Sequence, residues 1–237
     1  MNEIKDPFWS VVASFGIDKV FVHPEWAVKK KDEQQVPVTP SRGVSAEMTA
    51  LKKDIEGCRK CALGSSRINI VFGEGNPESG ILVVGEGPGA TEDETGRPFV
   101  GRSGQLLDSI LASIGLCREK LFIANIVKCR PPNNRVPSPA ESDICGKYLQ
   151  KQIEIMHPGV IIALGASAAR SLLDTRSGIG LLRENFHSYM DIPVLVTYHP
   201  AALLRSPALK RPVWEDMKKL KSFLDQTGLP RVSGEEK

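Results

Sequence analysis

A glycine-rich turn with one carboxylate is the first part of the chain whose residue types suggest chemistry. Glu86 stands between Gly85 and Gly87 in the run Val83–Gly89. Glycines lack a Cβ and let backbone amides approach a ligand closely. A dinucleotide-binding turn needs the spacing G-x-G-x-x-G and free amides, whereas this run is G-x-G-x-G and loses an amide at Pro88. Because a carboxylate also repels phosphate, Glu86 fits general-base or electrostatic work better.

Three further residues interrupt or follow apolar runs in a way that favours a ligand site. The amide of Asn125 could match the edge of a nucleobase, and an asparagine bonded to a neighbouring loop is an equal alternative. His199 follows an apolar run and precedes a proline. A single histidine is usually structural, but this one stands where a strand should end. Phe99 lies in a polar, glycine-flanked segment and is either core packing or a stacking platform.

Four of the five cysteines have spacings that suit metal binding. Cys58 and Cys61 form a CxxC pair, and Cys129 and Cys145 follow much later. Four thiolates can hold a [4Fe–4S] cluster or a tetrahedral zinc ion, and spacing does not separate the two. The alternative is a redox pair or surface coincidence together with two core cysteines. An odd number of cysteines fits poorly with a closed disulfide framework, so a reduced, intracellular setting with a metal site is favoured and Cys117 is expected to be a free thiol.

Basic side chains gather near these same segments. The net charge of +3 is too mild to indicate a nucleic-acid partner by itself. Clustering favours phosphate contacts over scattered surface charge. Leu203 and Leu204 could form an apolar wedge for a base stack or an ordinary buried helical turn. The clustered basic residues are Arg97, Arg102, Lys128, Arg130, Arg135, Arg205, Lys210 and Arg211.

Strands and helices that alternate along the chain must position these side chains. Short runs rich in valine and isoleucine predict strands, and periodic apolar stripes predict helices. Alternation of this kind predicts an α/β fold with three layers, in which helices cover both faces of a mostly parallel sheet. Ligands bind such sheets at the carboxyl ends of the strands, where Glu86, Asn125 and His199 stand. The expected strands are Ile68–Gly73, Ile81–Gly85, Leu121–Val127, Val160–Leu164 and Val194–Thr197, and the expected helices are Ser103–Ile114, Ser138–Met156, Ala166–Leu173 and Pro212–Leu224.

The 237 residues allow one sizeable domain and an appendage. The polar run that starts at Lys29 predicts a linker. We therefore expect an N-terminal extension over residues 1–45, a catalytic domain over 46–226 and a tail over 227–237. Residues 7–22 are expected to form a short amphipathic helix or a docking segment. The sequence contains neither a signal-like start nor a run of membrane-spanning length, which predicts a soluble cytoplasmic protein without a membrane partner, associated with the nucleoid in a prokaryote.

Together these segments resemble the family 4 uracil-DNA glycosylases. Gly85–Gly89 is similar to the first motif of that family and His199–Arg205 to its last, with Gly96–Gly101 and Asn125–Pro132 between them. The match runs in the order of the family from about Met48 to Phe223. The resemblance implies a three-layer fold around a four-stranded, mostly parallel sheet. It also implies hydrolytic removal of uracil from DNA, the first step of base excision repair.

The resemblance implies roles for individual residues. Glu86 would position or activate the attacking water, and His199 would stabilise the negative charge that builds on uracil O2. Phe99 would stack on the flipped base, and Asn125 would read its Watson–Crick edge. Glu92 would crowd the uracil C5 position and exclude thymine. Further implied pocket residues are Asn134, Gly85 and Gly87, the last at a position where many members carry alanine, and the implied DNA contacts are Arg102, Arg130, Arg135, Leu204 and Arg205.

The resemblance also selects a cofactor and a partner. It implies a structural [4Fe–4S] cluster in place of zinc, held by Cys58, Cys61, Cys129 and Cys145. The partner would be uracil-containing DNA, single- or double-stranded, bound by a monomer, and residues 1–45 could dock a repair or replication protein. A second hypothesis is a protein that binds uracil-DNA or abasic sites without turnover. That binding would be covalent through His187, although the preceding loop lacks the basic insertion of such relatives.

Overall fold

A six-stranded mixed sheet forms the centre of the computed structural model, which describes residues 43–230. The strand order is β1-β3-β2-β4-β6-β5. Four inner strands run parallel, and an antiparallel strand closes each edge. The parallel strands are β2 (Ile81–Gly85), β3 (Phe122–Asn125), β4 (Val160–Leu164) and β6 (Ile192–Thr197), and the edge strands are β1 (Glu74–Gly75) and β5 (Phe186–Tyr189). The expected sheet of four strands is therefore the parallel part of a larger mixed sheet.

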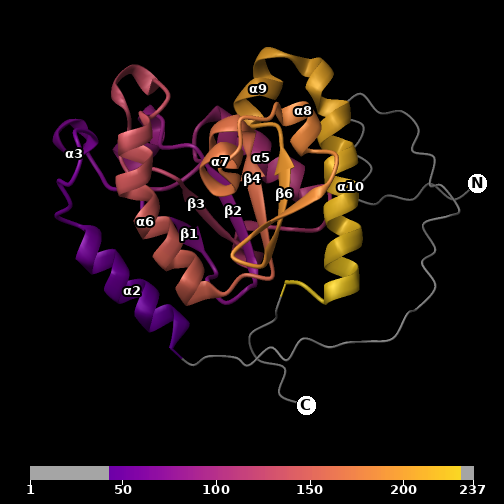
Figure 1. Ribbon diagram of the computed structural model, residues 1–237, viewed down its shortest axis with the longest axis horizontal. Helices are drawn as coiled ribbons and strands as arrows, with labels where there is room; N and C mark the ends of the chain where they lie inside the picture. Colours follow the sequence, from indigo (N-terminus) through magenta and orange to yellow (C-terminus); the bar gives the residue numbers. More distant parts are fainter. Residues whose placement is uncertain (1–42, 231–237) are drawn as a thin grey trace, which may run out of the picture.

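Helices cover both faces of this sheet and give the expected three layers. Figure 1 shows α2 and α6 on one side of the strands and α10 on the other. The first face carries α2 (Val44–Ile55), α6 (Pro139–Met156), α7 (Gly165–Leu173) and α8 (Ile179–Leu182), and the second carries α5 (Arg102–Ala112), α9 (Pro200–Arg205) and α10 (Lys210–Thr227). Shorter elements in the connections are α3 (Leu63–Ser66), α4 (Ala90–Thr95), η2 (Arg118–Lys120), η3 (Pro132–Asn134) and η4 (Pro207–Leu209).

Each face of the sheet packs on its own hydrophobic core because neighbouring strand residues point to opposite sides. In β2, Leu82 and Val84 join the core beneath α2 and α6, whereas Ile81 and Val83 join the core beneath α5 and α10. All four side chains are fully buried. Burial on both faces explains why the parallel strands are continuous apolar runs instead of alternating ones.

The start of α6 follows a local signal in the sequence. Ser138 is the N-cap and its hydroxyl accepts a hydrogen bond from the Glu141 backbone N–H. The Glu141 carboxylate accepts one from the Ser138 N–H in return, which completes a capping box. The Ser-Pro-Ala-Glu start predicted for this helix is confirmed.

The expected strand Ile68–Gly73 was wrong. Val71 and Phe72 are buried, but the segment is a loop, and Ile68 is 68% exposed. Its backbone is held by the Asp93 side chain, which accepts hydrogen bonds from the Ile68 and Asn69 N–H groups, and by one backbone bond from the Val71 N–H to the Lys128 carbonyl oxygen. The apolar run therefore reflects burial against the core and not strand pairing, which begins only at Glu74.

Residues 1–42 and 231–237 lie outside the described part of the chain. The predicted helix or docking segment at 7–22, the linker and the end of the tail therefore lie outside it as well. Helix α2 begins at Val44, close to the expected domain boundary at 46, and α10 ends at Thr227. Within residues 43–230, every helix is too short or too polar to cross a lipid bilayer.

Candidate active site and cysteine site

The predicted site residues follow the carboxyl ends of neighbouring parallel strands. Gly85 ends β2 and pairs in register with Asn125, which ends β3. Glu86 follows directly and is half-buried. His199 comes two residues after the end of β6. Since parallel strands end at one edge of the sheet, the structure brings these segments together as expected.

Gly85, Phe99 and Asn125 lie in close contact. A Cβ added to Gly85 would lie 2.4 Å from Cζ of Phe99 and 2.5 Å from Oδ1 of Asn125. These distances are far below van der Waals contact, so only glycine leaves room here. The Phe99 ring also faces His199, with ring centroids 5.5 Å apart and planes inclined by 33°. The Phe99 ring therefore lies close to the Asn125 carboxamide and to the His199 imidazole, next to Gly85, which has no side chain.

Asn125 carries a hydrogen-bonding group without a partner. Its side chain is 1% exposed. Among the buried side-chain nitrogen and oxygen atoms of residues 43–230, Asn125 Oδ1 is the one without a hydrogen-bond partner. Leaving such an acceptor unpaired costs on the order of 1–3 kcal/mol. The position therefore suits a ligand that brings a hydrogen-bond donor.

The turn that carries Phe99 is strained and is held by two charged side chains. Phe99 has φ 52°, a region that a bulky residue rarely adopts. Glu92, which is buried, accepts hydrogen bonds from the N–H groups of Val100 (2.9 Å) and Gly101 (2.8 Å). Arg118 donates to the carbonyl oxygens of Pro98 and Phe99 on the other side. The second Glu92 oxygen accepts from the Gly89 N–H at 3.1 Å, so the carboxylate joins the glycine-rich turn to the Phe99 turn.

His199 is held as a neutral imidazole. Its Nδ1 accepts a hydrogen bond from the Ala201 N–H at 3.1 Å, at the start of α9. Burial lowers the pKa of His199 to about 4, helped by the positive charge of Arg205 and opposed by Glu92. A neutral ring whose Nδ1 accepts must carry its proton on Nε2. His199 can therefore donate one hydrogen bond to a ligand without a net charge.

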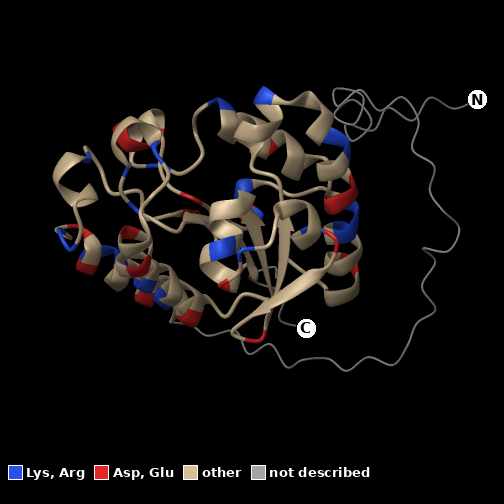
Figure 2. Cartoon of the chain, turned by 45° about the horizontal axis from the view of Figure 1, so that its top comes forward, with Lys and Arg blue, Asp and Glu red and all other residues tan. Residues whose placement is uncertain are grey.

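The basic residues that were expected to contact phosphate differ in their surroundings. Arg102 and Arg205 are exposed, and Leu204 is 44% exposed while its neighbour Leu203 is buried. Figure 2 shows lysine and arginine interspersed with acidic residues along α10 instead of forming one continuous block. Three other arginines bond to neighbouring side chains: Arg130 donates to Asn134 Oδ1 at 2.8 Å, Arg135 forms two hydrogen bonds of 2.7 Å with Glu141, and Arg97 forms two of 2.7 Å with Glu74.

Lys128 was wrongly placed among the phosphate-contacting residues. Its side chain is fully buried and donates to the Asn125 carbonyl oxygen at 2.9 Å and to Gln152 Oε1 at 2.6 Å. Burial lowers the pKa of Lys128 to about 8, an effect partly opposed by Cys145. A fully buried ammonium cannot reach a DNA backbone.

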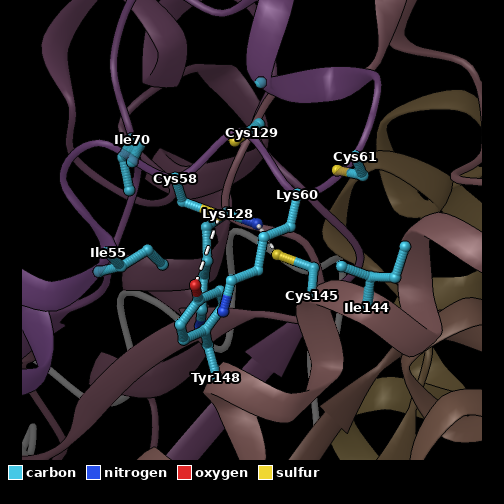
Figure 3. A pocket seen from close by; sticks show the side chains of 11 residues that line it. Ile55, Cys58, Lys60, Cys61, Ile70, Lys128, Cys129, Ile144, Cys145 and Tyr148 are labelled. Carbon is cyan, nitrogen blue, oxygen red and sulfur yellow. Dashed lines mark hydrogen bonds between the residues drawn. The ribbon is translucent and has the colours of Figure 1, made fainter.

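The four predicted cysteine ligands line one pocket that is partly open to solvent. They come from three places in the chain: the α2–α3 connection, the segment after β3, and α6 (Figure 3). All four are free thiols. Burial raises the pKa of Cys129 to about 11 and raises that of Cys145 as well.

Hydrogen-bond donors surround three of the four sulfur atoms. Cys58 Sγ accepts from the Tyr148 hydroxyl at 3.4 Å, Cys129 Sγ from Arg67 at 3.5 Å, and Cys145 Sγ from the Lys128 backbone N–H at 3.2 Å. Such donors stabilise thiolates and tune the metal centres they hold. Among residues 43–230, no group of three or more cysteine, histidine or carboxylate side chains lies in an arrangement that would hold a metal ion.

Comparison with known proteins identifies the family. Residues 72–218 match the sequence profile of the uracil DNA glycosylase superfamily. The chain belongs to this superfamily. It is 46% identical over 185 residues to the type-4 uracil-DNA glycosylase of Thermotoga maritima, a match that covers 76% of this chain and 96% of that one. The type-4 enzymes of Pyrobaculum aerophilum (42% identity, 72% and 91% coverage) and Archaeoglobus fulgidus (44%, 71% and 88%) are similar relatives.

Against this superfamily background, the position of His187 gives the covalent-binder hypothesis no support. His187 lies within the edge strand β5 and pairs with Val194 of β6. Its Nε2 lies 2.7 Å from the Leu182 carbonyl oxygen. The ring is therefore engaged inside a strand, whereas Glu86, Asn125 and His199 follow strand ends.

Three residues that support this superfamily site were not predicted. Gly165 follows β4 with φ 87°, and a Cβ there would lie 2.9 Å from Cβ of His199. Its position directly after an apolar run was the available signal. Gln152 lies four residues after Tyr148 on the buried face of α6, where a polar side chain stands out. Arg118 sits in a charged segment and shows no such signal.

Proposed function

We propose that this protein removes uracil from DNA by hydrolysing the N-glycosidic bond between uracil and deoxyribose, as the first step of base excision repair. Uracil-DNA glycosylase is the name of the type-4 relatives that match most of the chain. The observation that carries the proposal is the unpaired, buried Oδ1 of Asn125 against Phe99 and Gly85. That pocket suits a flat base with a donor on its edge.

Uracil has the hydrogen-bonding pattern that Asn125 needs. Its N3–H donates to Oδ1, and its O4 accepts from the Asn125 amide group. Cytosine has an acceptor at N3 and a donor at position 4, which would leave Oδ1 facing a lone pair. Because an unpaired buried acceptor costs on the order of 1–3 kcal/mol, the amide discriminates between the two bases. Phe99 supplies the face on which the flipped base stacks.

Cleavage of the bond puts positive charge on the sugar and negative charge on the leaving base. Glu86, at the end of β2, supplies a carboxylate for the sugar side and for the attacking water. His199, a neutral Nε2–H donor, stabilises the charge on uracil O2. Preorganised groups of this kind lower the barrier because they need no rearrangement as charge develops. Glu92 holds the turn of Phe99 and, as the wall near C5, would exclude thymine.

The cysteine site fits a [4Fe–4S] cluster held by Cys58, Cys61, Cys129 and Cys145. Four thiolates are the usual ligand set of such a cluster. The type-4 name of the relatives supports the cluster over zinc, which the same four thiolates could also hold. When bound, the cluster links three distant segments and leaves the reaction to the side chains at the strand ends.

DNA contacts come from the surface near the strand ends. Arg102, Arg205 and Leu204 are exposed there, and Leu204 offers an apolar side chain to the base stack. Arg130 and Asn134 bond to each other on the η3 loop, where Arg135 is also exposed. We expect these groups to bind phosphates, so binding should weaken as salt rises.

Residues 46–226 form the catalytic domain in this proposal, acting as a monomer, and residues 1–45 are free to dock a repair or replication partner. The Thermotoga maritima relative supports this division because 96% of its length matches only 76% of this chain. Truncation before Ala46 should leave excision intact and remove partner binding in a pull-down. Loss of excision on truncation would refute it.

Uracil release from a labelled oligonucleotide tests the proposed reaction directly. We expect free uracil and an alkali-labile abasic site, and a steep loss of rate in Glu86→Gln and Asn125→Ala. A visible absorption spectrum of the same sample tests for the cluster. If cluster-loaded protein released no uracil from single- or double-stranded substrate, the proposal would be abandoned.

A further inference from the structure

A lysine lies fully buried between the base pocket and the cysteine site. Lys128 Nζ donates to the Asn125 carbonyl oxygen and to Gln152 Oε1. No carboxylate of residues 43–230 lies within 4 Å of it. A buried charge is costly unless it is paired, so this ammonium needs a negative partner.

The neighbouring cysteine site can supply negative charge, because an ionised Cys145 and the Lys128 ammonium attract each other. Lys128 lines the cysteine cavity (Figure 3), and its own backbone N–H donates to Cys145 Sγ at 3.2 Å. Cys129 is the next residue in the chain. Four thiolates outweigh the positive charge of an iron–sulfur core, so a bound cluster is net negative. Its charge would attract the buried ammonium through the protein interior, where the dielectric constant is low and the attraction is strong.

The other side of Lys128 leads to the base pocket. Its ammonium binds the carbonyl oxygen of Asn125, the residue whose side chain holds the unpaired acceptor. Gln152, the second partner, lies on α6 two turns after Cys145 and also donates to the Phe72 carbonyl oxygen at 3.0 Å. One side chain thus ties the end of β3 to the helix that carries a cysteine ligand.

We propose that Lys128 is a positioning residue for uracil recognition: its ammonium pairs with the thiolate-held cluster and fixes the backbone of Asn125, and so sets the register of the base-reading amide. This inference rests on the proposed function. It also explains why a residue that never meets DNA is a lysine and not an apolar side chain of similar length.

The test replaces Lys128 with methionine in the full-length, cluster-loaded enzyme. Lys128→Met keeps an unbranched side chain that is one atom shorter, and it removes the charge and the donors. We expect the uracil-excision rate to fall about tenfold to a hundredfold, as for other residues that orient groups around a metal centre, with little change in KM for DNA. The reduction potential of the cluster should become more negative, because a nearby positive charge no longer favours the reduced form. Lys151→Met, at an exposed lysine of α6 beside Gln152, should change neither quantity.

Several outcomes separate this inference from the proposed function. A cluster-loaded Lys128→Met enzyme with a wild-type rate, or with an unchanged reduction potential, would overturn the inference. If Lys128→Met does not accumulate with its cluster, Gln152→Leu serves as the test. It removes one of the two hydrogen-bond acceptors of the Lys128 ammonium and leaves the positive charge in place. That variant should lose about tenfold in rate and keep its potential; a wild-type rate would overturn the inference. Absence of uracil release by the wild-type protein would instead reject the proposed function, and the potential would still report on Lys128.

Discussion

The proposed base pocket has room for a base only because residue 85 is a glycine. A methyl group there would overlap the Phe99 ring and Asn125 Oδ1, at 2.4 and 2.5 Å. We expect Gly85→Ala to lower uracil excision at least a hundredfold, while overpacking costs only about 1–3 kcal/mol of stability. Uracil release and thermal unfolding measure the two effects. Gly180→Ala is the matched control, because an added Cβ there meets nothing within 4 Å.

His199 should remain neutral in the folded protein well into acid. Its pKa of about 4 lies below the usual 6.5, so the unfolded chain binds the proton more readily. The stability that neutral His199 contributes is therefore complete above about pH 6.5 and is lost as the pH falls towards 4. Histidine-selective NMR titration should give a midpoint near 4, and excision should fall over the same acid range. A midpoint near 6.5 would contradict the buried, Nδ1-accepting state.

At the scale of elements, the Phe99 turn and the glycine-rich turn act as one unit because Glu92 binds both. Glu92→Gln keeps the size of the side chain but replaces an accepting oxygen with an N–H₂ group that faces backbone donors. We expect about 1–3 kcal/mol of destabilisation and slower uracil excision, because Phe99 is no longer held at its strained φ. Melting temperature and release rates for uracil and thymine measure this. Glu94→Gln, exposed on the same helix, is the control.

This substitution also separates two roles of Glu92. If Glu92 acts only by crowding the C5 position of uracil, glutamine of equal size should leave both stability and uracil excision unchanged. Thymine release should then stay absent as well. Loss of stability with thymine still excluded would instead show that the backbone contacts matter.

At the scale of the whole molecule, the cysteines connect segments that are far apart in the sequence. Loss of the cluster should loosen α2, the η3 loop and α6 together. For Cys145→Ser we expect loss of visible absorption, loss of at least about 3 kcal/mol of stability and a melting temperature lower by roughly 6–12 °C. Iron content, absorption and thermal unfolding test this. Cys117→Ser, at an exposed free thiol, should match the wild type; equal stability of the two variants would argue against a structural cluster.

The sequence by itself determined the parallel strands, the main helices and the family. Continuous apolar runs, helical stripes and the Ser138 capping box are local signals, so β2, β3, β4, β6 and α6 were predicted close to their observed bounds. Glu86, Asn125 and His199 were placed at strand ends because the alternation of elements implies a parallel sheet. Motif order then indicated uracil as the ligand, which fold alone does not.

Only the tertiary structure decided which apolar runs pair as strands and which charges are buried. The edge strands β1 and β5 are too short or too exposed to show a pattern, and Ile68–Gly73 is buried without pairing. Lys128 looked like a phosphate contact because its partner Gln152 is 24 residues away. Glu92 likewise bonds to a turn eight residues ahead. Such burial depends on partners brought together by folding, and local sequence patterns carry no information about them.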